Sequence, residues 1–217
     1  RGRARGRQDG CRAARSAFAA LVVPGRFAVA AGAGQYPGEH EEQVREPVEV
    51  ADGLRAHRVD DFEPMVSMWQ DEAIYRHIIG RPSTASETWS RLLRYIGHWH
   101  ALGFGYWVIE DRQSGLYLGE AGFADFRRDM DPPLGPEPEA GWALVSSVHG
   151  CGLATEVMLA AHAWMDAHNP HDHTLCILAP EHAASIRVAE KCGYSHAYDT
   201  TFAGGLTSVM KRARPSA

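Results

Sequence analysis

Apolar and polar positions from residue 48 onward change their period several times, which predicts a domain of mixed α and β structure. Helical spacing of apolar residues predicts one helix after Asp60 and a second helix from Thr84 to Leu102. Glu87 stands three residues after Thr84, the spacing of a capping box, and Gly103 is expected to end the second helix. A first strand is expected before both helices, over Leu54 to Val59.

Short apolar runs bounded by turn residues predict the remaining strands. These runs span Tyr106 to Ile109, Tyr117 to Phe126, Ala140 to Val145, Thr174 to Ala179, Tyr194 to Phe202 and Leu206 to Lys211. A helix of about 15 residues is expected between the third and fourth runs, and Ser185 to Lys191 predicts another. The order strand, glycine loop, helix, strand from Ala140 to Ala179 requires a right-handed crossover between two parallel strands. We therefore expect an α/β (α+β) fold: a mixed, mostly antiparallel sheet with one parallel pair and flanking helices.

Residues 1–47 differ from the rest of the chain in composition. They are rich in Arg, Gly and Ala and keep neither a helical nor a strand period. We therefore expect a disordered tail before a domain over residues 48–217. An export signal is the alternative, because the basic stretch Arg1 to Arg15 precedes the apolar residues Ala17 to Val23. That apolar run is about seven residues long, the lower limit for such a signal.

Composition and charge exclude several classes of protein. The 217 residues are 45% hydrophobic and 23% charged, as in an ordinary globular protein. The longest uncharged apolar run, Ser16 to Gly25, is too short to span a membrane. The tail holds eight arginines against five acidic residues, and the rest of the chain holds 14 basic against 22 acidic residues, a net charge of −8. An acidic domain argues against nucleic-acid partners and favours attraction of a cationic substrate such as an amine.

The segment from Val145 to Glu156 places two glycines directly before an amphipathic helix. Free N–H groups at such a helix start can bind a phosphate, and Gly150 and Gly152 allow an anion to approach closely. No Lys follows as in a nucleotide P-loop, and Thr155 replaces the third glycine of a dinucleotide-binding loop. A tight helix entry that binds no ligand is the remaining alternative.

This segment resembles motif A of the GCN5-related N-acetyltransferase (GNAT) superfamily, with the pattern R/Q-x-x-G-x-G/A. The chain has His149-Gly-Cys-Gly-Leu-Ala154 there, followed by Thr and Glu. Ser185-Ile-Arg-Val-Ala-Glu-Lys-Cys-Gly-Tyr194 resembles the end of the core in the branch that contains the ribosomal-protein N-acetyltransferases. Pro138-Glu-Ala-Gly-Trp142 resembles the strand that ends in an acyl-CoA-gripping bulge. The resemblance covers residues 48–212 in element order and implies the acyl-CoA N-acyltransferase fold.

The resemblance implies an enzyme that transfers an acetyl group from acetyl-CoA to a primary amine by direct attack, without a metal. The pyrophosphate of acetyl-CoA is expected on the N–H groups of the glycine loop, and the pantetheine beside the preceding strand end. The implied cofactor-binding residues are Leu144, Val145, Ser146, His149, Gly150, Cys151, Gly152, Leu153, Ala154, Thr155, His182 and Ser185.

Three positions depart from the family pattern. His149 stands in place of Arg or Gln, and His182 stands in place of Asn. Ala189 occupies the position where many relatives have a tyrosine general acid. These departures keep open a different class of protein, a catalytically silent acyl-CoA-binding or regulatory module.

Two carboxylates are candidates for the general base. Glu139 is the first candidate because it begins the central strand beside the expected cleft, and Glu120 on the preceding strand is the second. Ser185 or Tyr194 is the candidate acid in place of Ala189. The acceptor is left open among a ribosomal-protein N-terminus, an antibiotic, a polyamine and an amino acid, as is the choice between monomer and homodimer. Because the four cysteines form no CxxC pair, a reducing cytoplasm is the expected location.

Overall fold

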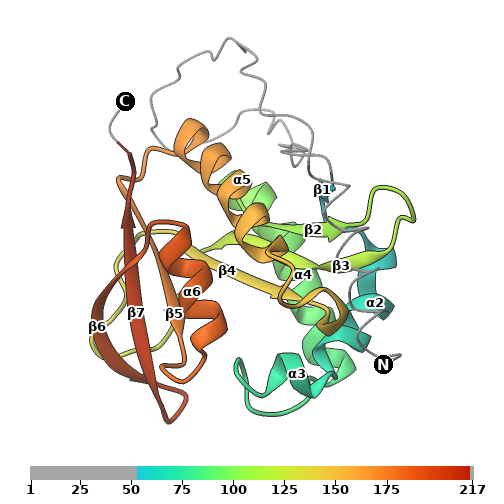
Figure 1. Ribbon diagram of the computed structural model, residues 1–217, viewed down its shortest axis with the longest axis horizontal. Coiled ribbons are helices and arrows are strands. Elements are labelled where there is room, and N and C mark those ends of the chain that lie inside the picture. The colour runs from blue at the N-terminus through green and yellow to red at the C-terminus, as the bar shows by residue number, and fades with distance from the viewer. Residues whose placement is uncertain (1–52, 216–217) are drawn as a thin grey trace, which may run out of the picture.

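The computed structural model describes residues 53–215. The predicted tail over residues 1–47 and its alternative, an export signal, lie outside the described residues. The described chain forms one seven-stranded sheet in the order β1-β2-β3-β4-β5-β7-β6 (Figure 1). Its strands are β1 (Leu54–Arg55), β2 (Tyr106–Glu110), β3 (Tyr117–Ala124), β4 (Glu139–Leu144), β5 (His173–Leu178), β6 (Ser195–Phe202) and β7 (Gly205–Ala213).

Five α-helices and two short 3-10 segments accompany the sheet in the described chain. The helices are α2 (Phe62–Trp69), α3 (Glu72–Tyr75), α4 (Ala85–Leu102), α5 (Leu153–His168) and α6 (Ala183–Lys191). The 3-10 segments are η1 (Val59–Asp61) and η2 (Ser146–Val148). The predicted capping box of α4 is confirmed, because the Thr84 side chain accepts from the Glu87 N–H while the Glu87 carboxylate accepts from the Thr84 N–H.

The sheet has the predicted mixed topology. β4 and β5 run parallel, joined through α5, and the other neighbouring strands pair antiparallel. Helices α5 and α6 cover one face, and α2 and α4 cover the other (Figure 1). Each face has its own apolar core: Trp107, Phe123 and Met158 lie in the core under α5, and Met65, Leu92 and Tyr106 lie in the core under α2 and α4.

The structure corrects one local prediction and adds one element that the sequence analysis missed. The first strand ends at Arg55 instead of Val59, because the Arg58 N–H donates to the Asp61 carboxylate at 2.6 Å and turns the chain into η1. The short helix α3 was not predicted from the sequence. It begins where the Asp71 carboxylate accepts from the Ala73 N–H at 2.9 Å, an N-cap with too few following residues to show a helical period.

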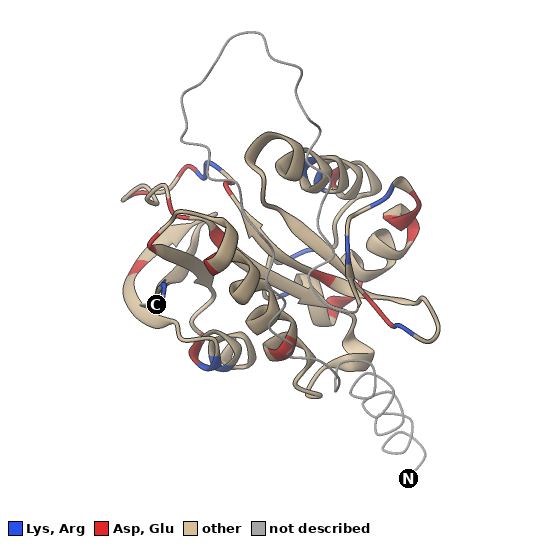
Figure 2. Cartoon of the chain, turned by 90° about the horizontal axis from the view of Figure 1, so that it is seen from above, with Lys and Arg blue, Asp and Glu red and all other residues tan. Residues whose placement is uncertain are grey.

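Charged residues of both signs are spread along the ribbon (Figure 2). None of the helices in the described range is long and apolar enough to cross a membrane.

Candidate functional site

The parallel strands β4 and β5 are joined at one end. Glu139 pairs with Leu175, and the Leu175 N–H donates to the Pro138 carbonyl oxygen at 3.1 Å. Within residues 53–215, no further pair links the two strands, although β4 continues to Leu144. The strands therefore diverge toward their C-terminal ends (Figure 1).

The edge of β4 that faces β5 carries the backbone groups of alternate residues: Ala140, Trp142 and Leu144. The Val145 N–H points to the opposite side, because it donates to the Leu118 carbonyl oxygen at 2.9 Å. An open strand edge can hydrogen-bond an extended ligand as an added strand. This edge is thus a site for a chain-like ligand with amide groups.

The glycine loop follows β4 through η2 and leads into α5. Gly150 and Gly152 adopt left-handed backbone conformations, with φ of 77° and 85°. A Cβ placed on Gly150 would meet no heavy atom within 4 Å, so the loop faces open space there. Gly152 caps α5 without a side-chain hydrogen bond, and the first N–H groups of the helix, from Leu153 onward, lie in the turn that the sequence predicts as an anion site.

His149 is tied to the end of β4. Its Nε2–H donates to the Leu144 carbonyl oxygen at 2.7 Å. The ring therefore occupies one of the acceptors on the strand edge that a chain-like ligand would use. Cys151, in the same loop, is buried.

The short helix α3 is anchored to Ser146, which follows this strand end. The Ser146 hydroxyl donates to the Asp71 carboxylate at 2.6 Å. The hydrogen bonds from Ser146 and from the Ala73 N–H lower the pKa of Asp71. Asp71 therefore stays ionised and holds the residue that follows β4 in place.

The segment after α3 also contacts the start of α6. The rings of His77 and His182 stack with centroids 4.2 Å apart. Burial, together with the positive charge that His77 and His149 can carry, lowers the pKa of His182 to about 4. Ser185 is buried in the first turn of α6, where its N–H donates to the His182 carbonyl oxygen at 3.0 Å. His182 and Ser185 thus lie at the start of α6, where the charge of His149 acts on His182.

Glu139 is buried in an ion pair. Both of its carboxylate oxygens accept from the Arg128 guanidinium, at 2.7 Å each. The Arg128 guanidinium also lies over the rings of Phe126 and Phe202. Arg128 therefore holds the Glu139 carboxylate in a fixed orientation, and the fork of Arg128 uses most of its lone pairs.

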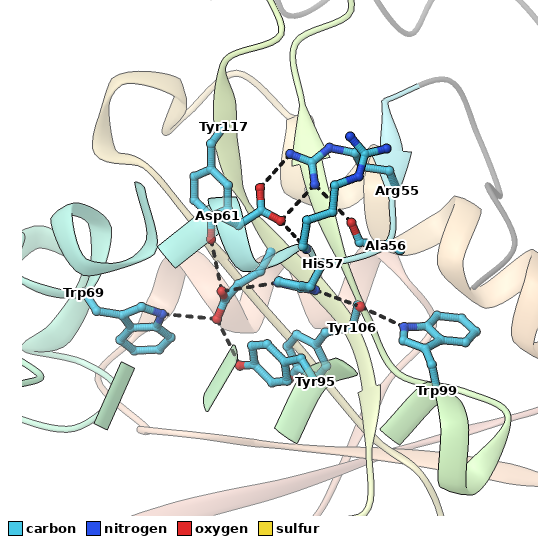
Figure 3. A network of polar contacts seen from close by, with 11 residues as sticks. Arg55, Ala56, His57, Asp61, Trp69, Tyr95, Trp99, Tyr106 and Tyr117 are labelled. Atoms are coloured by element: carbon cyan, nitrogen blue, oxygen red, sulfur yellow. Dashed lines mark hydrogen bonds and ion pairs between the residues drawn. The ribbon is translucent and has the colours of Figure 1, made fainter. Parts of the chain in front are cut away.

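Glu120 lies fully buried on β3, opposite Ala143 of β4. Its carboxylate accepts from the Trp69 indole N–H at 3.2 Å, the Tyr95 hydroxyl at 2.9 Å and the Tyr117 hydroxyl at 3.0 Å. Trp69 and Tyr95 donate to one carboxylate oxygen and Tyr117 to the other, and His57 Nε2 lies 3.9 Å from the second oxygen (Figure 3). Burial and the charge of Glu120 raise the pKa of both tyrosines well above the usual value. Three hydrogen-bond donors therefore surround the Glu120 carboxylate.

Tyr194 is separate from these groups. Its hydroxyl forms a hydrogen bond of 2.8 Å with the Thr174 hydroxyl, next to Leu175 at the joined end of β4 and β5. The ring is buried against His162. Burial raises the pKa of Tyr194 well above its usual value, so this hydroxyl holds its proton in the core.

Several residues of this region were not found from the sequence. Asp71, His77 and Arg128 come from loops or short elements that follow no motif, and only the fold brings them beside β4 and α6. The described residues contain no group of three or more His, Cys, Asp or Glu that could hold a metal ion.

Comparison with known proteins assigns the family. The acetyltransferase (GNAT) domain family matches residues 53–195. A GnaT-family acetyltransferase from Bordetella pertussis is 31% identical, with a TM-score of 0.64 over 74% of this chain and 94% of that chain. Spermidine N-acetyltransferase from Vibrio cholerae, solved with CoA and spermine, is 16% identical, with a TM-score of 0.59 over 74% of this chain and 94% of that chain. The ribosomal-protein-S5-alanine acetyltransferase from Vibrio fischeri is 15% identical, with a TM-score of 0.57 over 74% of this chain and 92% of that chain. With its diverging parallel strands and its glycine loop, this chain belongs to the GNAT family of acetyl-CoA-dependent acetyltransferases.

Proposed function

We propose that the protein transfers the acetyl group of acetyl-CoA to a primary amine by direct attack of the amine on the thioester. The observation that carries this proposal is the open edge of β4 immediately before the glycine loop. The edge can pair with the amide groups of pantetheine, and the loop can bind the pyrophosphate. A structural relative from Vibrio cholerae was solved with CoA and spermine, which supports a CoA-linked amine reaction for this fold.

In this proposal the backbone holds acetyl-CoA. The N–H groups from Gly150 to Thr155 bind the pyrophosphate, and Leu144 to Ser146 lie beside the pantetheine. Of these strand-end residues, Leu144 faces the opening, whereas the Val145 N–H is already bonded to Leu118. We therefore assign the Leu144 N–H as the donor that polarises the thioester carbonyl and stabilises the oxyanion. His149 must release the Leu144 carbonyl oxygen when the pantetheine takes its place.

The acceptor must lose a proton before or during attack. At pH 7, deprotonation costs about 1.4 kcal/mol for an α-amine and about 4.6 kcal/mol for a lysine side chain. An α-amine therefore needs little help, whereas a lysine needs an effective base.

The two candidate bases receive different roles. Glu120 lies level with Ala143, one residue from Leu144, and the hydroxyls of Tyr95 and Tyr117 that donate to its carboxylate can pass a proton to it. Glu139 lies at the joined end of the strands and is held by Arg128, so as a base it can act only if that pair opens. Ser185 is the better placed of the two candidate acids, because it lies beside His182 whereas Tyr194 is buried at the joined end.

Thiol release in mixtures of acetyl-CoA and single amines tests the proposal. We expect release that depends on the amine, and no acetylated enzyme by mass spectrometry when acetyl-CoA is present alone. Binding of acetyl-CoA without release for any amine would overturn the proposal. A pH profile of kcat/KM for Glu120→Gln and Glu139→Gln then separates the bases: the variant of the true base loses the acidic limb.

The acceptor belongs to the same proposal. The branch resemblance and the fold shared with the Vibrio fischeri enzyme support a protein N-terminus, which presents the less costly α-amine. An amino acid, a polyamine and an antibiotic are the competing acceptors in the amine panel.

A further inference from the structure

A pocket of about 320 Å³ lies between α4 and the segment that precedes it. Three arginines, three serines, Ile79 and Glu87 line it, and we call it the α4 pocket. Guanidinium and hydroxyl groups are donors, so the lining is built to satisfy an acceptor-rich ligand. Glu87 is the one acidic residue of the lining.

The charges of the α4 pocket are unbalanced. Arg81 is neutralised by Glu87, which accepts from both of its terminal nitrogens. For Arg91 and Arg94, no carboxylate of the described residues lies within ion-pair distance. The two stand three positions apart on α4, where like charges share one helix face and repel. A bound anion would relieve that repulsion.

Aromatic rings hold both guanidinium groups in place. Arg91 lies over the Trp69 ring, 3.7 Å from its centroid, and Arg94 lies over the Phe126 ring at 4.9 Å. Stacking covers the face of a guanidinium and leaves its N–H edge to donate. Arg91 also donates to the Ser83 hydroxyl at 3.4 Å, a long contact that leaves most of its donors for a ligand.

The same two rings connect the α4 pocket to the proposed catalytic carboxylates. Trp69 donates its indole N–H to Glu120. Phe126 also carries Arg128, which holds Glu139 at the start of β4. The α4 pocket therefore lies on the α2 and α4 face of the sheet, and Trp69 separates its Arg91 from Glu120.

We propose that the α4 pocket binds a carboxylate of the acceptor, so that the acceptor is a primary amine that also carries a carboxylate. This inference rests on the proposed acetyl transfer to an amine. A planar carboxylate matches the fork of donors that a stacked arginine presents. The pocket also disfavours polycationic amines, because unpaired arginines repel a second positive charge. The acidic body of the domain attracts cations at long range, whereas this local charge selects among them.

Matched pairs of acceptors test the inference by thiol release from acetyl-CoA. In the first pair, 5-aminovalerate carries the carboxylate and butylamine lacks it. In the second pair, both dipeptides have an amidated C-terminus, and Ala-Glu carries a side-chain carboxylate where Ala-Gln has an amide. We expect the carboxylate member of at least one pair to react with a kcat/KM about tenfold higher or more, as for a charge-assisted hydrogen bond. A preference in the first pair indicates a small amino acid as the acceptor, and a preference in the second pair indicates an acidic peptide. Equal rates within both pairs overturn the inference while leaving acetyl transfer intact.

Variants locate the effect. Arg91→Gln and Arg94→Gln are expected to raise the KM of the carboxylate acceptor about tenfold relative to the KM of its neutral partner, so that the preference for the carboxylate is lost. Arg214→Gln removes an exposed arginine near the end of β7 and serves as the control. Equal losses with both members of a pair would overturn the inference.

A binding measurement separates this inference from the proposed function. Glutarate, which has no amine, is titrated into the wild-type protein and the two variants by calorimetry. Heat that is lost in Arg91→Gln and Arg94→Gln supports the α4 pocket even if no amine releases thiol. Absence of heat with wild-type protein, together with equal rates for the amine pairs or no thiol release, overturns the inference.

Discussion

The imidazole rings of His77 and His182 stack 4.2 Å apart and 8° from parallel, joining the segment after α3 to the residue before α6. Burial is the main reason that the pKa of His182 falls to about 4. Coulombic interactions with His77, His149 and Arg76 act in the same direction, and the interaction with Glu181 opposes them. His182 is therefore neutral at pH 7 in the free protein, at a position that the family resemblance assigns to acetyl-CoA.

The affinity for acetyl-CoA should rise as the pH falls from 7 to 5. A pyrophosphate beside His182 favours its protonated form, so binding raises its pKa from about 4 and takes up a proton. The affinity for acetyl-CoA begins to rise near the pKa of His182 in the complex. It stops rising below the pKa of His182 in the free protein. Calorimetry in buffers of different ionisation enthalpy measures the proton uptake.

His182→Gln is the matched variant for this titration. It keeps a polar side chain of similar length and removes the proton site. The pH dependence should be weaker in the variant than in the wild type, and a dependence unchanged by the substitution would contradict the prediction.

Gly150→Val should raise the Kd of acetyl-CoA at least tenfold. The left-handed backbone at Gly150, with φ of 77°, strains a β-branched residue, and the new side chain would fill the open space in front of the loop N–H groups. The loss of stability from the backbone alone is about 1–2 kcal/mol. Calorimetry with acetyl-CoA and thermal unfolding measure the two effects.

Gly115→Val controls for the backbone strain. Gly115 has φ of 69° in the turn between β2 and β3, and a Cβ there also meets nothing within 4 Å. We expect a similar loss of stability and an unchanged affinity. Equal affinities of the two variants for acetyl-CoA would contradict the anion role of the glycine loop.

Elements with strong local signals could be predicted from the sequence. The capping box at Thr84 and the glycine at position 103, with φ of 72°, fix both ends of α4 by local chemistry. The parallel pair followed from chain order, because a strand, a helix and a strand allow only one common crossover. The first strand was predicted too long, since apolar alternation does not show that Arg58 and Asp61 turn the chain.

The glycine loop, like α4, could be predicted because its signal is local in the sequence. The surroundings of Glu120 and Glu139 could not be predicted in this way. Arg128 and Glu139 lie 11 positions apart and meet only because the loop between them folds back. Trp69 reaches Glu120 across 51 positions, a pairing that sets the burial of the carboxylate. Such long-range contacts decide whether a carboxylate is free, paired or buried, and no local pattern encodes them.

The ion pair between Arg128 and Glu139 should be costly to break from one side. Arg128→Met leaves a buried carboxylate without its partner, which is expected to lower the free energy of unfolding by about 3 kcal/mol. The double variant Arg128→Met with Glu139→Gln removes the unpaired charge and should recover more than half of that loss. Urea unfolding of the wild type, both single variants and the double variant measures the coupling. Additive losses would contradict the assignment of a coupled buried pair.

The buried His162 should make the fold sensitive to acid. Neither ring nitrogen has a hydrogen-bond partner, and the ring packs against Phe123 and Tyr194. Burial, assisted by the positive charge of Arg212, lowers the pKa of His162 to about 3. In the unfolded chain His162 binds a proton near pH 6.5, whereas in the folded protein it stays neutral until about pH 3. The free energy of unfolding therefore falls as the pH drops from 6.5 toward 3.

His162→Phe should therefore stabilise the protein. The substitution keeps an aromatic ring against Phe123 and removes two unsatisfied nitrogens, which is expected to raise the free energy of unfolding by about 1 kcal/mol at pH 7. The gain should grow at pH 5, where the unfolded wild-type chain carries the extra proton. Urea unfolding at pH 7 and pH 5 measures both values. A gain that is the same at both pH values would show that His162 does not contribute to the acid dependence.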